Sequence, residues 1–111
     1  MLEIVEQQHD GVCVASLLGK LAAEQVPIFE EWNNRRNDGV EKRIILDFSG
    51  LTYLSSAGLR AILTANRHAE RTGTALLFCG LGGMTRQVFQ TAGLLAYLPV
   101  YPGVKEALEA K

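Results

Sequence analysis

The sequence has few of the residues on which specialised chemistry usually depends. Its 111 residues include two cysteines, Cys13 and Cys79, and two histidines, His9 and His68. Both cysteines lie in apolar runs, so we expect buried free thiols, although the sequence does not exclude a disulfide. The histidines have no cysteine or carboxylate at ligand spacing. We therefore expect neither a metal site nor a cofactor.

Strong charge and long apolar segments are also missing. The formal net charge is −1 and no run of Lys or Arg occurs, which argues against nucleic acid or a membrane lipid as the main partner. No apolar run reaches the length of a membrane span, and the acidic, alternating Met1–Glu6 does not resemble a signal peptide. We expect a cytoplasmic protein without membrane insertion, folded as a single domain over residues 1–111.

Strand-like and helix-like patterns alternate along the chain. Apolar patterns predict strands at 2–6, 12–18, 43–48, 74–79 and 98–100, and helices at 21–34, 57–70, 85–92 and 103–108. Asp10-Gly11 predicts a hairpin, Pro27 indicates a kink or a late helix start, and Asn37-Asp38-Gly39 predicts a turn. This order favours an α/β fold with a mostly parallel sheet of about four to five strands, an antiparallel edge strand and about four helices.

The segment Asp47–Arg60 connects a predicted strand to a predicted helix. Ser55 or Ser56 is placed to cap this helix, because a serine hydroxyl can accept a hydrogen bond from a free N–H of the first turn. The same N–H groups and the helix dipole favour an anion there. Residues on the apolar helix face and in the strands should form one core: Leu46, Leu59, Ile62, Leu63, Leu77 and Val88. Phe89 is either part of that core or an exposed hydrophobic contact.

The segment L-D-F-S-G-L-T-Y-L-S-S-A-G-L-R closely resembles the central motif of STAS domains, the fold of bacterial anti-sigma factor antagonists. The resemblance places Ser56 on the serine that is phosphorylated in that family, with Ser55 as a competing acceptor. It places Gly58-Leu59 on the family's Gly-Leu and Asp47 on the Asp that closes the preceding strand. It continues through 88–89, 92–94 and 101–102, and so covers nearly the whole chain.

This resemblance implies a phosphorylation-controlled switch. The unmodified protein would bind an anti-sigma factor with serine kinase activity, the phosphorylated protein would release it, and a serine phosphatase would reset the cycle. The expected partner-binding residues are Asp47, Ser55, Ser56, Ala57, Gly58 and Arg60. The alternative is a STAS adaptor without a phosphorylation cycle, such as the small cytosolic subunit of a lipid-transport ATPase complex.

Two positions depart from the family pattern. Ser55 stands where an acidic residue often precedes the phosphorylated serine, and Ala22 stands where an Asp is often found. Both changes remove negative charge near the site, which bears on kinase recognition and magnesium positioning. Asp47 could instead satisfy loop N–H groups, and Gly58 could serve close packing or simply be tolerated at a helix end.

An enzyme is not expected. The serine pair at a strand-to-helix turn resembles a nucleophile elbow, but the G-x-S-x-G pattern is absent. No histidine and acid follow in a plausible order, since His68 lies further along the same predicted helix.

Overall fold

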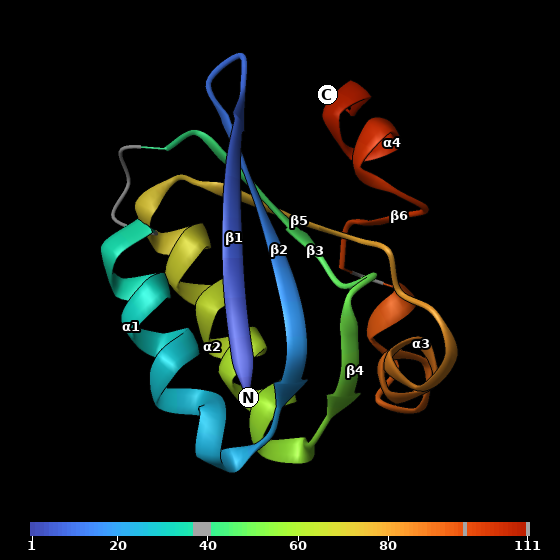
Figure 1. Cartoon of the computed structure of the whole chain (residues 1–111). Coiled ribbons are helices and arrows are strands. Elements are labelled where there is room, and N and C mark those ends of the chain that lie inside the picture. Colours follow the sequence, from blue (N-terminus) through green and yellow to red (C-terminus); the bar gives the residue numbers. More distant parts are fainter. Residues whose placement is uncertain (37–40, 97, 111) are drawn as a thin grey trace.

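The computed structural model describes residues 1–36, 41–96 and 98–110, which form a six-stranded sheet with helices on both faces (Figure 1). The strands are β1 (Leu2–His9), β2 (Val12–Leu21), β3 (Arg43–Asp47), β4 (Leu51–Leu54), β5 (Ala75–Cys79) and β6 (Val100–Tyr101). The helices are α1 (Val26–Arg36), α2 (Ser56–Thr72), α3 (Gly83–Thr91) and α4 (Val104–Glu109), with 3₁₀ turns at Ala23–Gln25 and Leu94–Ala96. No described helix is long and apolar enough to cross a membrane.

The sheet confirms the α/β prediction of mostly parallel strands with an antiparallel edge. Its order is β1-β2-β3-β5-β6, with β4 paired to the last residues of β2. Only the β1–β2 pair is antiparallel among the described strands. The hairpin prediction also holds, because Asp10 and Gly11 both have positive φ, as a tight two-residue hairpin turn requires.

Near the site, the end of β2 and the start of α1 differ from the sequence-based prediction, and one strand was not predicted. Strand β2 does not end at Gly19 but continues to Leu21, because Gly19 absorbs a register shift with φ of 104°. Helix α1 therefore starts late, at Val26, and Pro27 lies in its first turn, where a missing N–H costs little. Strand β4 was not expected at all. The predicted turn at 37–39 lies outside the described residues.

The core is divided between the two faces of the sheet, and the prediction of one core was wrong. Leu46 and Ile62 are fully buried with α1, α2 and α3 on one face, whereas Leu77 is buried with Ala107 of α4 on the other. Alternate strand residues point to opposite faces, so a sheet covered on both sides needs two clusters. Phe89 belongs to the larger cluster and is 0% exposed.

The inward face of α2 is also rotated from the predicted one. Leu59, Leu63 and Val88 were expected in the core but are half-buried at its edge. The buried residues of α2 are mainly small: Gly58, Ala61, Ile62, Ala65 and Ala69. Small side chains let the helix lie close to the sheet, so the longer leucines are turned towards the rim.

Cys13 and Cys79 are free and buried, as expected. Burial raises the pKa of Cys13 to about 11 and that of Cys79 to about 12. Both thiols therefore stay protonated at neutral pH, which leaves them without the thiolate that reactive cysteines need.

Glu6 ties β1 to α1 and should make the stability of the fold sensitive to acid. Its carboxylate accepts hydrogen bonds from Arg36 Nε at 2.7 Å and Nη2 at 2.9 Å, and from Trp32 Nε1 at 2.6 Å. These bonds, that from Arg36 first, lower the pKa of Glu6 below its ordinary value of 4.5. The stabilisation that the ionised Glu6 gives to the folded state is therefore complete above pH 4.5, the ordinary pKa. It is lost as the pH falls through the lower pKa of the folded state.

We expect Glu6→Gln to lower the free energy of unfolding at pH 7 by about 1 kcal/mol or less, because the pair is partly exposed. The difference from wild type should shrink below pH 4. Thermal melts at pH 7 and below pH 4, followed by the fluorescence of the single tryptophan, measure this difference. Glu3→Gln, at an exposed position of the same strand, is the control. A difference in stability that does not change with pH would contradict the assignment of this contribution to the ionised Glu6.

Candidate functional site

The site predicted from the sequence forms where the chain passes from β3 through β4 into α2. Strand β4 pairs in parallel with the end of β2. Beside this ladder, Gly19 N–H donates to Gly50 O at 3.1 Å, and Thr52 Oγ1 donates to Gly19 O at 2.9 Å. One residue beyond the end of β4, Ser55 N–H donates to Leu21 O at 3.1 Å. These contacts fix where α2 begins.

The two serines at this helix start have different roles. Ser55 is the N-cap: its backbone is extended, and its Oγ accepts a hydrogen bond from Gly58 N–H at 3.2 Å. Ser56 is the first residue of α2 and is exposed. The structure thus decides between the two capping alternatives in favour of Ser55. It leaves the hydroxyl of Ser56 accessible at the positive end of a 17-residue helix.

Ser56 lies on the rim of a groove between α2 and α3. This α2–α3 groove has a volume of about 360 Å³ and is lined by Ser56, Leu59, Met84, Gln87, Val88, Thr91 and Ala92. None of these residues carries a charge. Leu59, Val88 and the exposed Met84 give the groove an apolar surface next to the serine hydroxyl.

Helix α3 is held in place by three aromatic rings. Phe48, directly after β3, contacts Phe78 of β5 at 6.1 Å and Phe89 of α3 at 5.6 Å between ring centroids. Thr85 Oγ1 donates to Gly82 O at 2.9 Å and anchors the start of the helix. Met84 was not predicted at this site because the predicted helix began at Thr85, and Leu59 and Val88 were predicted to lie in the core. The Gly82-Gly83 pair just before Met84 was the sequence feature that could have placed the start of α3 earlier.

A second groove lies on the other side of α2. It is lined by Ala23, Val26, Glu30, Ala57, Arg60, Ala61 and Thr64 and has a volume of about 260 Å³. Arg60 is exposed here, one helical turn after Ser56. The first two turns of α2 therefore present Ser56 towards α3, and Ala57 and Arg60 towards α1.

Asp47 is fixed by a contact within the β3–β4 connection and not by Ser55 or Ser56. Its Oδ1 accepts a hydrogen bond from Ser49 N–H at 3.0 Å. Gly80, with φ of 74°, lies so close that a side chain there would overlap Asp47 Oδ1. This geometry supports the loop-satisfying interpretation of Asp47, and its role in partner binding stays a prediction.

Gly58 is buried against the end of β2. A Cβ at this position would overlap Leu21 O and would lie 2.9 Å from Leu21 Cγ and 3.0 Å from Leu54 Cδ1. Packing inside the domain therefore requires glycine at position 58, independently of any contact that a partner makes there. The neighbouring Ala22 N–H donates to Gln25 Oε1 at 3.0 Å, so the β2–α1 connection is ordered without the Asp that the family often has there.

We expect Gly58→Ala to reduce the free energy of unfolding by about 1–2 kcal/mol, although alanine favours a helix by about 1 kcal/mol over glycine. The added methyl meets the backbone of Leu21, which cannot move without disturbing β2. Chemical denaturation measures the loss. Gly82→Ala, where no atom lies within 4 Å of the added Cβ, should cost less. Equal losses in the two variants would argue against the close contact at Gly58.

The chemical groups around Ser56 are few. The α2–α3 groove contains no histidine or carboxylate to activate Ser56. Among the described residues no group of three or more His, Cys, Asp or Glu could hold a metal ion. The exposed serine, the helix dipole and the apolar groove together form a surface that one added charge would alter strongly.

Known proteins resemble this chain in sequence and in fold. A putative anti-sigma factor antagonist of Bordetella bronchiseptica, BtrV, is 30% identical over 99 residues, which cover 89% of this chain and 85% of BtrV. An anti-sigma factor antagonist from Mycobacterium paratuberculosis superposes with a TM-score of 0.88 at 23% identity, covering 97% of this chain and 92% of that chain. The Bacillus cell fate determinant SpoIIAA, in its phosphorylated form, has a TM-score of 0.73 at 22% identity, covering 98% and 97%.

These names describe regulatory proteins and not enzymes, in agreement with the expectation that the chain has no enzymatic activity. The model of the STAS domain family matches residues 3–107, which is nearly the whole length and includes both serines. The resemblance seen in the central motif therefore extends to the complete fold, and the chain belongs to the STAS domain family.

Proposed function

We propose that this protein is an anti-sigma factor antagonist whose binding is controlled by phosphorylation of Ser56. The observation that supports this most strongly is that Ser55 and Ser56 have different roles at the start of α2. Ser55 is half-buried and occupied as the N-cap, whereas Ser56 is exposed beside the uncharged α2–α3 groove. A kinase can reach Ser56 without disturbing the cap.

Phosphorylation at this position acts on the partner more than on the domain itself. It adds about −1.5 to −2 charges at a helix N-terminus, where the backbone N–H groups and the dipole tolerate them. A partner that covers the apolar groove would then have to bury an unpaired dianion, which costs several kcal/mol. The unmodified protein therefore binds its partner, and the phosphorylated protein releases it.

The names of the relatives support a choice of partners. BtrV and the mycobacterial protein are described as anti-sigma factor antagonists, and SpoIIAA has been obtained phosphorylated. We therefore assign this chain an anti-sigma factor with serine kinase activity as its binding partner and a serine phosphatase that reverses the modification. We propose that the chain meets both partners in the cytoplasm.

A competition experiment tests this proposal. The cognate anti-sigma factor is loaded with its sigma factor, the unmodified chain is added, and the complexes are separated by size-exclusion chromatography. We expect the chain to co-elute with the anti-sigma factor and free sigma factor to appear. If the sigma factor stays bound at saturating concentrations of the chain, the protein is not an antagonist of that factor.

A further inference from the structure

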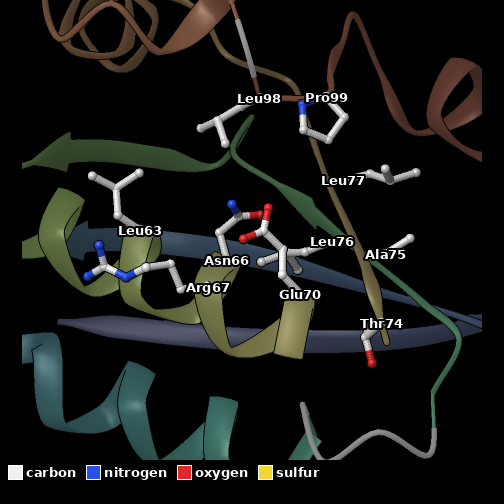
Figure 2. A pocket seen from close by; sticks show the side chains of 10 residues that line it. All are labelled: Leu63, Asn66, Arg67, Glu70, Thr74, Ala75, Leu76, Leu77, Leu98 and Pro99. Carbon is white, nitrogen blue, oxygen red and sulfur yellow. The ribbon is translucent and has the colours of Figure 1, made fainter. Parts of the chain in front are cut away.

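Helix α4 covers the second face of the sheet, the face turned away from α2. Figure 2 shows the alternation along β5: the side chain of Leu76 lies on the side of α2, and that of Leu77 lies on the opposite side. Leu77 belongs to the cluster that packs against α4, and the other sheet residues of this cluster include Val14, Ile45 and Cys79. Each of these residues is at most 7% exposed, so their burial depends on the helix that covers them.

Few contacts hold α4 itself. It is six residues long, and a helix of this length has little stability of its own in water. Of its residues only Ala107 is buried, whereas Val104 and Leu108 are half-buried. Its start has no side-chain cap, because the N-cap residue is Gly103. The helix therefore depends on contacts with the rest of the domain.

The polar contact that holds α4 comes from Arg43, the first residue of β3. Its Nη2 donates a hydrogen bond to Ala107 O at 2.8 Å, and its Nη1 donates a longer one to Leu108 O at 3.5 Å. Carbonyl groups in the last turn lack the helical partner that earlier carbonyls have, and the negative end of the helix dipole also attracts a cation. Among the described residues Arg43 forms no ion pair, so no carboxylate competes with α4 for its charge. Arg43 therefore fastens the C-terminal end of α4 to the sheet.

The chain has a pivot just before α4. Gly80 N–H donates to Pro102 O at 3.2 Å, so the chain is tied to the segment after β5 up to this residue. Beyond Pro102 the described backbone forms hydrogen bonds only within α4 and with Arg43. Gly103, the next residue, is loosely surrounded, since a Cβ there would approach only the flexible side chain of Glu106. Helix α4 can therefore swing as a unit without breaking the pairing of β6.

We propose that α4 is a latch that opens about Gly103 while the rest of the domain stays folded, and that Arg43 is the contact that holds it closed. Local opening of a protein starts where few buried contacts and few hydrogen bonds have to be broken, and α4 meets both conditions. The open form exposes an apolar part of the sheet on the face opposite α2. The latch is a second two-state element of the molecule, and it does not depend on phosphorylation of Ser56.

The two cysteines allow the latch to be tested on the full chain, because they lie on opposite faces of the sheet. Cys79 is buried with α4 and Cys13 in the larger cluster on the other face, and both are 0% exposed. The native protein is treated with iodoacetamide, and the labelled peptides are quantified by mass spectrometry. Each thiol loses its proton to the buffer, and the thiolate displaces iodide. We expect Cys79 to react at least about tenfold faster than Cys13, because only the latch has to open. Equal rates would show that both thiols become accessible by unfolding of the whole domain, and the proposal would be wrong.

Arg43→Met tests the contact that closes the latch, because it removes both hydrogen bonds to α4 but keeps an unbranched side chain. It should speed the alkylation of Cys79 by about tenfold and leave that of Cys13 unchanged. Lys42→Met, at the exposed neighbouring position, is the matched control and should change neither rate. A faster reaction of both cysteines in Arg43→Met, or of neither, would overturn the role of Arg43.

Amide hydrogen exchange followed by NMR shows where the chain opens. The amide of Ala107, which donates to Gly103 O within the latch, should exchange at least about tenfold faster than that of Phe78, which donates to Pro99 O beside β6. If the two amides exchange at the same rate, β6 opens together with α4 and the pivot at Gly103 is wrong.

Discussion

Ser56→Glu is expected to bind the cognate anti-sigma factor about tenfold more weakly than wild type, whereas Ser56→Ala should keep the wild-type affinity, a difference of about 1.4 kcal/mol. The reason is the position of the side chain. It is exposed on the rim of a groove without charged residues, so a carboxylate there has no partner to pair with once the groove is covered. Alanine removes the acceptor but leaves the apolar surface intact, and the variant cannot be switched off.

Calorimetric titration of the three proteins against the anti-sigma factor measures this effect, and thermal melts accompany it. Gln8→Glu is the charge control, because it adds the same charge at an exposed position near the β1–β2 hairpin, at the opposite end of the molecule from the start of α2 (Figure 1). It should bind as wild type does. Equal affinities of the Ala and Glu variants at Ser56 would favour the adaptor hypothesis, in which no phosphorylation cycle operates.

Phe89→Ala is expected to lower the free energy of unfolding by about 3–5 kcal/mol, the usual cost of removing a fully buried aromatic ring. Phe89 is 0% exposed and packs against Phe48 at 5.6 Å and Phe78 at 6.1 Å, both edge-on. These rings join α3 to the ends of β3 and β5. The substitution should therefore also loosen the α2–α3 groove and weaken partner binding.

Urea denaturation measures the loss. Met84→Ala on the same helix provides the comparison, because Met84 is 39% exposed and its side chain contributes to the groove and not to the core. It should cost about 1 kcal/mol or less in stability. If the two variants lose the same amount, the aromatic cluster does not hold α3.

Sequence patterns predicted those features that depend on neighbouring residues. Asp10-Gly11 predicted the hairpin because its turn requires positive φ at both positions, which short polar residues and glycine adopt readily. The serine pair before an apolar helix predicted the start of α2, although only the structure assigns the cap to Ser55. The apolar runs predicted β3 and β5 because both are covered on two faces.

The features that the sequence did not predict depend on contacts between distant segments. Strand β4 exists because Gly19 and Leu21 of β2 offer hydrogen-bond partners to residues 50–55. The inward face of α2 is decided by the contact of Gly58 with Leu21, which a helical-face pattern of leucines does not reveal. Leu59 therefore lines the groove at the site and is not part of the core.

The most direct test of the central claim is phosphorylation itself. The chain is incubated with the cognate kinase and ATP, the modified residue is mapped by mass spectrometry, and the product is melted and titrated calorimetrically into the anti-sigma factor. We predict a single phosphate on Ser56, a melting temperature close to that of the unmodified chain, and binding weakened by about tenfold or more. A phosphate on Ser55, or unchanged affinity with a phosphate on Ser56, would contradict the account.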